Sequence, residues 1–226
     1  LFVRFFESLN HPYFYYIPDR ENDGYGASKK LFEKLILKKP KLIIMVDCGS
    51  TSYRSIAYLN SKKIKSIIID HHEINKPYPK TNVLINPKKN INNPSKDYYC
   101  ATTLTYFFLE IMIKKIKSSF NLSNYLIYVL LALVCDVMPL RGFNRKILTV
   151  GFRNLVVKNK GLKKLISNNL KKKITYQDIG FSIGPLINSS GRIAKANDVV
   201  ELFLSQNDDK INSILNRMNN HNITRK

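Results

Sequence analysis

Five side chains of this sequence could together bind a metal ion. They are three aspartates, each of which follows an apolar run, and two adjacent histidines: Asp47, Asp70, Asp136, His71 and His72. A carboxylate beside apolar residues is costly to bury unless it is hydrogen-bonded or holds a cation. Carboxylate and imidazole together suit a divalent transition ion such as Mn²⁺, whereas all-oxygen ligand sets suit Mg²⁺ and Ca²⁺ better. The first hypothesis is therefore a site for Mn²⁺, with Mg²⁺ as the alternative.

Each piece of this pattern has an ordinary structural explanation when it is taken alone. An Asp that follows a strand is commonly a turn residue or a helix cap, so Asp47 by itself indicates no chemistry. A pair such as His71 and His72 can lie on the surface or be satisfied by backbone groups. Only the joint pattern favours a metal site.

A second segment that could do chemistry is Asn188-Ser189-Ser190-Gly191-Arg192. A guanidinium pairs bidentately with phosphate oxygens, and glycine permits close approach of the backbone, so Asn188 and Arg192 could hold a phosphate. Ser, Asn and Gly are also ordinary turn residues, which leaves a turn-and-cap role open for the same segment.

Strand-length apolar runs alternate with amphipathic stretches in the first third of the chain. Strands are predicted over residues 14–17, 42–46 and 67–69, and helices over residues 28–37 and 52–61. Such alternation predicts a βαβαβ unit with parallel strands. In open α/β sheets ligands gather beyond the carboxyl ends of the strands, so Asp47 and Asp70 are expected at the same edge.

The second half of the chain is predicted to be mostly helical. A Pro- and Asn-rich connection covers residues 76–94, and a short extended piece is predicted over residues 179–183. Helices are predicted over residues 101–116, 123–135, 144–157, 162–170 and 197–204, and from Asp208 to the last residue. The fold class is therefore α/β, a parallel β-sheet flanked by helices, with a mostly helical second half.

The net charge favours a polyanionic partner. Lys and Arg total 37 against 16 Asp and Glu, which gives a formal charge of +21. Nucleic acid is the first such partner to consider. Because the sequence is rich in Lys, Asn and Ile together, AT-rich coding drift is an alternative source of the excess, and the lysine clusters are scattered along the chain rather than forming one tail.

Cysteine content and hydropathy restrict the compartment. The three cysteines are odd in number and widely spaced, which favours neither a disulfide framework nor a zinc ribbon and fits a reducing cytoplasm. The longest apolar stretch, residues 125–134, is too short to span a bilayer, so no membrane is expected. Residues 1–9 carry charges inside their apolar pattern and do not fit a signal-peptide core.

The order of these motifs resembles that of the DHH phosphoesterases. Asp70-His71-His72 comes after Val46-Asp47-Cys48-Gly49 and before Cys135-Asp136-Val137-Met138-Pro139-Leu140, in an order and spacing similar to motifs two, three and four of that superfamily. The flanking segments resemble those of the RecJ exonucleases: Tyr16-Ile17-Pro18-Asp19-Arg20, Gly24-Tyr25-Gly26, Asn144-Arg145, Ile179-Gly180-Phe181, Pro185, Asn188, Gly191-Arg192 and residues 220–226. The resemblance covers nearly the whole chain.

This resemblance implies a role for each matching residue. Asp47, His71 and Asp136 are expected to ligate one ion, with Asp47 bridging to a second. His72 is expected to face the scissile phosphate as a catalytic residue. Asp70 is expected to assist catalysis by orienting the imidazole rather than by binding the ion, because metal-bound histidines usually donate their other N–H to a carboxylate or carbonyl.

The implied mechanism is two-metal hydrolysis. Two ions, Mn²⁺ or Mg²⁺, would lower the pKa of a shared water and hold the phosphate oxygens. Asn188, Arg192 and Arg145 are expected to bind the substrate.

Two positions depart from the family pattern. The first motif, Asp-x-Asp-Gly after the first strand, is absent and is expected upstream of Leu1. Where RecJ proteins have a glycine-containing turn, this chain has Cys100-Ala101-Thr102-Thr103, which leaves the local backbone path open. We therefore expect residues 1–205 to form a DHH catalytic domain without its first motif, and residues 206–226 to begin a helix toward a further domain. The fragment alone is expected to bind Mn²⁺ weakly and to be inactive.

The function that the resemblance implies is a 5′→3′ single-stranded DNA exonuclease, a hydrolase acting in DNA repair and recombination. Its expected partners are single-stranded DNA, a single-strand-binding protein and a helicase. One alternative is a DHH enzyme that acts on short oligonucleotides, cyclic dinucleotides or pyrophosphate. Another is a non-catalytic relative that binds nucleic acid or a replication partner.

Overall fold

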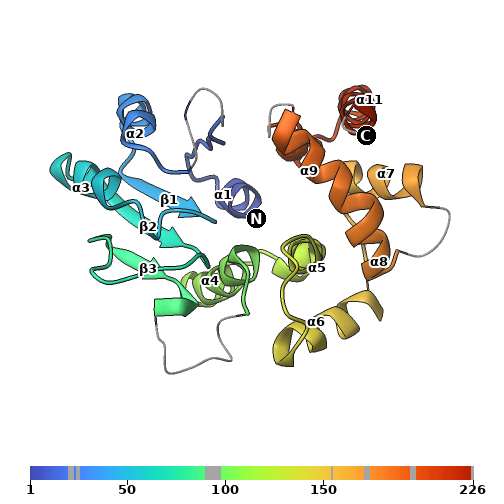
Figure 1. Ribbon diagram of the computed structural model, residues 1–226, viewed down its shortest axis with the longest axis horizontal. Helices are drawn as coiled ribbons and strands as arrows, with labels where there is room; N and C mark the ends of the chain where they lie inside the picture. The colour runs from blue at the N-terminus through green and yellow to red at the C-terminus, as the bar shows by residue number, and fades with distance from the viewer. Residues whose placement is uncertain are drawn as a thin grey trace. The chain divides into compact units, whose positions relative to one another are not determined.

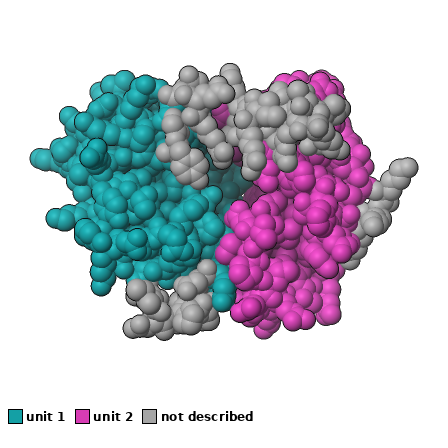
Figure 2. All heavy atoms as spheres, viewed as in Figure 1, with its two compact units in different colours: residues 1–122 teal, residues 123–226 magenta. Residues whose placement is uncertain are grey.

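A computed structural model describes most of the chain in two compact units. The described residues are 1–19, 23, 26–89, 98–153, 155–170, 174–193 and 197–224, with backbone only for residues 189–193 and 221–224. Unit 1 is Leu1–Leu122 and unit 2 is Ser123–Lys226 (Figure 2). The contact pattern thus divides the chain at residue 122, and the expected domain boundary at residue 205 stays a prediction.

Unit 1 contains a parallel sheet. Its elements are α1 (Phe2–Ser8), α2 (Lys29–Leu35) with a 3-10 turn (Ile36–Lys38), β1 (Leu42–Val46), α3 (Tyr53–Ser61), β2 (Lys65–Ile69), β3 (Val83–Ile85), a 3-10 turn (Pro87–Lys89) and α4 (Ala101–Ile116). Within the described residues the strand order is β1-β2-β3, with Val46 opposite Ile69 and Ile69 opposite Ile85. All three strands therefore end at one edge.

Helices cover both faces of this sheet. Figure 1 shows α2 and α3 on one side of the sheet and α4 on the other. α1 packs against α4, with the ring centroids of Phe2 and Phe108 5.9 Å apart. The core between the first pair and the sheet consists of apolar side chains at helical and alternating spacing: Leu31, Phe32, Leu35, Met45, Ile56, Leu59 and Ile68. Burial of this stripe is what holds the strands in place.

Unit 2 is helical in its described part. Its elements are a 3-10 turn that starts at the boundary (Leu122–Tyr125), α5 (Leu126–Cys135), α6 (Gly142–Arg153), α7 (Lys160–Asn169), α8 (Tyr176–Asp178), a π-helix (Ile179–Ile183), α9 (Gly184–Ile193), α10 (Asn197–Leu204) and α11 (Asp208–Thr224). The almost wholly apolar α5 packs against α6, the π-helix and α9. At Gly161 a side chain would lie 2.0 Å from the Leu202 carbonyl oxygen, so this glycine permits the close approach of α7 and α10.

The α/β fold class is confirmed, while two of the predicted extended segments are wrong. Residues 14–17 form no strand, and the strand that joins β1 and β2 is β3, which follows them in the chain. Residues 179–183 are a π-helix that buries Ile179 and Ile183 on successive turns. Cys100 precedes α4 with an extended backbone, so the helix opens at Ala101 without a glycine.

No helix in the described part of the chain is both long and apolar enough to cross a membrane.

Candidate metal centre

The first pair of metal-binding side chains lies where β1 and β2 end. The Asp47 N–H donates to the Ile69 carbonyl at 2.9 Å, which extends the ladder by one residue. Asp47 has a left-handed backbone (φ 61°), a conformation that Asp adopts more readily than most side chains. Its Oδ1 lies 3.1 Å from His71 Nε2. Asp47 is 58% exposed and His71 is 17% exposed, so this pair is open to solvent on the carboxylate side.

His72 completes a cluster of three side chains. Asp47, His71 and His72 each place one oxygen or nitrogen ligand atom within 4.8 Å of the other two. The two imidazole rings are 4.8 Å apart between centroids and inclined by 59°. One carboxylate and two imidazoles form a donor set that fits a divalent transition ion. The structure thus brings together the three side chains that follow β1 and β2 and are exposed enough to reach an ion.

Asp70 is buried beneath this cluster and is 1% exposed. Its Oδ2 accepts the Ser50 N–H at 3.0 Å. Its Oδ1 accepts the His71 N–H at 2.8 Å, the His72 N–H at 3.3 Å and a hydrogen bond from His72 Nδ1 at 2.7 Å. Burial raises the pKa of this carboxyl, but hydrogen bonds from Ser50 and His72 outweigh burial and lower the pKa below its ordinary value. Asp70 is therefore an ionised anchor that contacts the ring of His72 and the backbone of His71.

Asn86 is a polar residue of this edge that sequence reasoning missed. It follows β3 as Asp70 follows β2, and it is 7% exposed. Its Nδ2 donates to Ser50 Oγ at 2.8 Å and to the His72 carbonyl at 2.9 Å, while its Oδ1 accepts the Lys88 N–H at 2.9 Å. Asn86 thus ties the loops after all three strands together. The sequence feature that could have identified Asn86 is the apolar triplet Val83–Ile85 directly before it, which lies inside the Pro- and Asn-rich connection.

Cys48, beside Asp47, is not among the side chains whose ligand atoms cluster within 4.8 Å of one another. Burial raises the pKa of its thiol to about 11, with the charges of Asp70 and Asp47 adding to the effect. All three cysteines lie in the described part of the chain, and none of them is in a disulfide bond. The donor set at the edge therefore consists of oxygen and nitrogen atoms.

A comparison of the chain with models of known protein families finds a match for the region that contains this edge. The model of the DHH family, N-terminal domain, matches residues 1–133, which is more than half of the chain. The chain belongs to the DHH family. The match includes Asp47, Asp70 and both histidines, and it ends inside α5.

The relatives of this DHH-family chain are RecJ proteins, as the motifs predicted. It is 29% identical over 224 residues to "Single-stranded-DNA-specific exonuclease RecJ" of Haemophilus influenzae, and 29% identical over 226 residues to the protein of that name from Escherichia coli. Each match covers 94% of this chain but 39% of the relative. The chain therefore spans well under half the length of these relatives.

Solved structures support the same fold. The crystal structure of exonuclease RecJ bound to manganese matches with a TM-score of 0.87 at 22% identity, over 99% of this chain and 57% of that chain. RecJ from Thermus thermophilus in complex with Mn²⁺ matches with a TM-score of 0.84 at 20% identity, over 99% of this chain and 32% of that chain. At this level of identity the likeness establishes the architecture.

The third expected metal ligand of this DHH-family chain, Asp136, lies in unit 2. It directly follows α5, its N–H donates to the Ala132 carbonyl at 2.9 Å, and it is exposed. The next residue, Val137, has a left-handed backbone (φ 51°) and is 86% exposed. Because Asp47 and His71 belong to unit 1, the role of Asp136 as a ligand stays a prediction.

The expected substrate-binding residues also lie in unit 2. Arg145 is exposed on α6 and Asn188 is exposed on α9. The backbone of Arg192 lies in α9, so the segment from Asn188 to Arg192 is helical and the turn interpretation is wrong. The Arg192 side chain lies outside the described part of the chain, as do Arg20, Gly24 and Tyr25. Their contacts with substrate stay predictions.

Proposed function

We propose that this chain carries the metal-binding edge of a phosphodiesterase that removes nucleotides from the 5′ end of single-stranded DNA, in DNA repair and recombination. The observation that supports this most is the cluster of Asp47, His71 and His72 at the carboxyl ends of β1 and β2, anchored by buried Asp70. The names of the relatives support the substrate. The 5′ direction rests on the family resemblance.

The proposed cofactor is Mn²⁺, with Mg²⁺ as the alternative, in two sites. Related RecJ structures are complexes with one or the other of these metals. Asp47 and His71 would hold one ion, with Asp136 as the proposed third ligand. When bound, such ions lower the pKa of a water and neutralise phosphate oxygens.

The role of His72 follows from its contact with Asp70. A carboxylate at 2.7 Å from Nδ1 holds a proton on that nitrogen, so in the neutral ring the lone pair is on Nε2. The His72 side chain is half exposed, which makes it accessible to substrate. Nε2 can then accept a proton or a ligand bond at the open side of the cluster. We propose that His72 acts there on the scissile phosphate or its water, with Asp70 and Asn86 as positioning residues.

Metal binding by the chain itself tests the site without relying on activity. Mn²⁺ titration followed by electron paramagnetic resonance should show binding that Asp47→Asn and His71→Ala each weaken at least about tenfold, because each removes a ligand. His11→Ala is the matched control, since His11 is an exposed histidine outside the cluster. Equal affinities in all four proteins would overturn the assignment.

Hydrolysis assays test the substrate. With the expected Asp-x-Asp-Gly motif supplied upstream of Leu1, we expect mononucleotides to be released from the 5′ end of a single-stranded oligonucleotide in Mn²⁺, and no release from a blunt duplex; residues 1–226 alone should release little or nothing. Faster hydrolysis of dinucleotides or cyclic dinucleotides would favour the oligonucleotide phosphoesterase instead. Metal binding without any hydrolysis by the protein that carries the upstream motif would favour a nucleic-acid-binding relative.

We also propose a single-strand-binding protein and a helicase as partners, in the reducing cytoplasm. Three widely spaced cysteines, an odd number, support the compartment. Co-purification with each partner from nuclease-treated extracts tests the two associations.

A further inference from the structure

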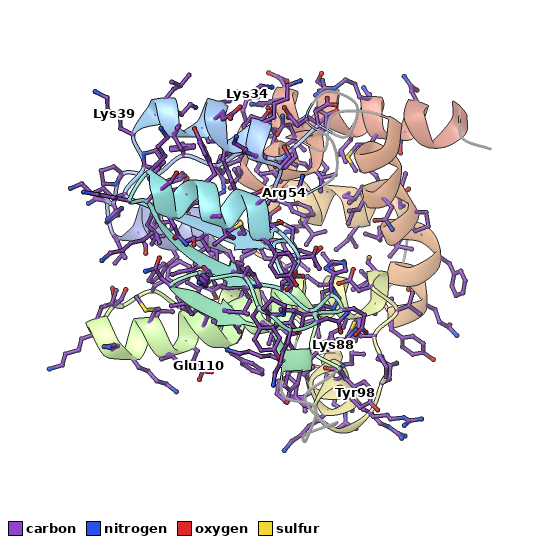
Figure 3. All side chains as sticks on the ribbon, turned by 60° about the vertical axis from the view of Figure 1, so that its left-hand side comes forward. Lys34, Lys39, Arg54, Lys88, Tyr98 and Glu110 are labelled. Carbon is purple, nitrogen blue, oxygen red and sulfur yellow. The ribbon has the colours of Figure 1, made fainter. Side chains whose placement is uncertain are left out.

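The other edge of the sheet in unit 1, where the strands begin, carries a basic surface. The loops that enter β1 and β2 line an open hollow of about 680 Å³. Its lysines, named here the lysine edge, are Lys39, Lys41, Lys62, Lys63 and Lys65. Figure 3 shows Lys39 at the end of the sheet where the strands begin and Lys88, which follows β3, toward the end where they finish. The lysine edge is therefore remote from the metal centre along the strands.

These lysines form a concentration of positive charge. All five are exposed, and the described residues place no carboxylate at ion-pair distance from any of them. Other lysines of unit 1 do have acidic partners, such as Lys34 with Asp23 at 2.8 Å and Lys29 with Glu33 at 3.6 Å. The lysine-edge backbones are adjacent, since the Lys65 N–H donates to the Lys41 carbonyl at 3.3 Å. Like charges held this close repel one another, and a bound polyanion would relieve the repulsion.

We propose that the lysine edge binds the phosphate backbone of a nucleic-acid strand, as a contact separate from the metal centre. The choice of single-stranded DNA as that strand rests on the proposed function. Lysine ammonium groups act as point charges on phosphate and need no fixed geometry, which suits an exposed and flexible set. The Tyr58 ring lies nearby, with the ammonium groups of Lys29 and Lys62 at 5.4 and 5.7 Å from its centroid.

An acidic peptide fits the hollow less well. Peptide recognition usually relies on an apolar anchor in a desolvated pocket. Here the hollow is open to solvent, and five of the nine residues that line it are lysines. The observed surface offers charge rather than a closed socket, which favours a repeated phosphate over a side-chain anchor.

The backbone at two lysine-edge residues permits substitutions that preserve the fold. Lys39 (φ 53°) and Lys63 (φ 56°) follow helices in left-handed conformations that favour glycine. Lys117 (φ 53°) has the same conformation after α4, outside the hollow. Glycine at any of these positions removes one charge and relieves the backbone.

Binding to a fluorescein-labelled oligothymidylate, measured by anisotropy in EDTA, tests the proposal without hydrolysis or metal. The double variant Lys39→Gly/Lys63→Gly should bind at least about fivefold more weakly at low salt, and its slope of log K against log salt should be smaller by about 1.4, which is two single-strand phosphate contacts. The charge-matched control is Lys115→Ala in α4 combined with Lys117→Gly directly after α4, and the affinity of this variant should change less than about twofold.

The outcomes separate this proposal from its rivals. Equal losses in both double variants would show that net charge alone governs binding and would overturn the lysine edge as a site. Tighter binding of a polyglutamate peptide than of the oligonucleotide, lost in the lysine-edge variant alone, would overturn the nucleic-acid assignment in favour of an acidic protein. If the lysine-edge variant lost oligonucleotide affinity as expected but the wild type bound no Mn²⁺, the metal centre would be contradicted and the lysine edge would still be supported.

Discussion

The two edges of the sheet in unit 1 carry charges of opposite sign, and they differ in whether the charged groups are buried and hydrogen-bonded or exposed. At the edge where the strands end, Asp70 is 1% exposed and accepts hydrogen bonds from Ser50, His71 and His72. At the edge where the strands begin, the lysine edge is exposed and has no acidic partner among the described residues. A group that must orient an imidazole needs fixed geometry, whereas contact with a polyanion needs only charge. The comparison predicts that substitutions at the first edge change stability and metal binding, and that substitutions at the second change affinity for anions.

The largest effect is expected for Asp70→Ala. This change leaves the buried Ser50 N–H without its acceptor and releases the ring of His72, so the free energy of unfolding should fall by about 3 kcal/mol. Urea denaturation followed by circular dichroism measures the loss. Asp70→Asn keeps one acceptor oxygen and should lose less. If Asp70→Ala were as stable as the wild type, the buried carboxylate would not stabilise this edge, and the proposed difference between the two edges would be wrong.

The next effect concerns Asn86→Ala, which removes two donated hydrogen bonds and one accepted bond. We expect a loss of about 2 kcal/mol in stability and a roughly tenfold or greater loss in Mn²⁺ affinity, because groups that orient ligands typically contribute about 10- to 100-fold. Asn60→Ala is the matched control, since Asn60 makes one exposed hydrogen bond to the Lys80 carbonyl at 2.8 Å. Equal Mn²⁺ affinity in the two variants would reduce Asn86 to a structural residue.

That Asn86 had to be found in the structure shows what the sequence can and cannot predict here. The runs before Asp47 and Asp70 are strongly apolar, and these two strand ends were predictable from local pattern. β3 has only three residues and is held by pairing with β2, a contact that its own sequence does not signal. Asn86 was missed because its strand was missed.

Short apolar runs were the other source of error. Residues 14–17 look like a strand, yet Phe14, Tyr15 and Tyr16 are 38%, 43% and 44% exposed and pair with no strand in the described part of the chain. Residues 179–183 are also largely apolar but form a π-helix. In such short runs helix and strand share the same composition, and only the tertiary partner decides between them. The helices over residues 101–116 and 197–204 were predicted with their observed bounds, because each is an uninterrupted run without Gly or Pro that is longer than two turns.

A smaller, pH-dependent effect is expected at Asp23, a buried carboxylate that is paired with a lysine. Hydrogen bonds from Lys34 and then from Tyr16 lower the pKa of Asp23 to about 2. Because the folded pKa lies below the ordinary value of 3.8, the stabilisation is complete above about pH 4 and is lost as pH falls toward 2. Asp23→Asn should therefore be less stable than the wild type by roughly 1–2 kcal/mol near neutral pH.

Urea denaturation at several pH values from near neutral down to about 3 checks the sign at Asp23. The difference between wild type and Asp23→Asn should shrink as the pH decreases. A difference that stayed constant over this range would mean that the Asp23 carboxylate contributes nothing through its charge.

The smallest expected effect is a gain in stability for Lys63→Gly at the lysine edge. A left-handed backbone costs a non-glycine residue about 1–2 kcal/mol, and glycine removes this strain. Glycine also makes the unfolded chain more flexible, which offsets part of the gain, so the net increase in the free energy of unfolding should be about 0.5 kcal/mol. Removal of one of several adjacent like charges adds to that gain at low salt. Lys117→Gly relieves the same backbone conformation outside the hollow, where the nearby Lys114 is paired with Glu110, so its gain comes mainly from the backbone. Thermal unfolding of both variants should show a larger gain for Lys63→Gly at low salt and equal gains at high salt, where exposed charges are screened. Equal gains at both salt concentrations would mean that the lysines of this edge do not repel one another, and the two edges of the sheet would then differ in the sign of their charge alone.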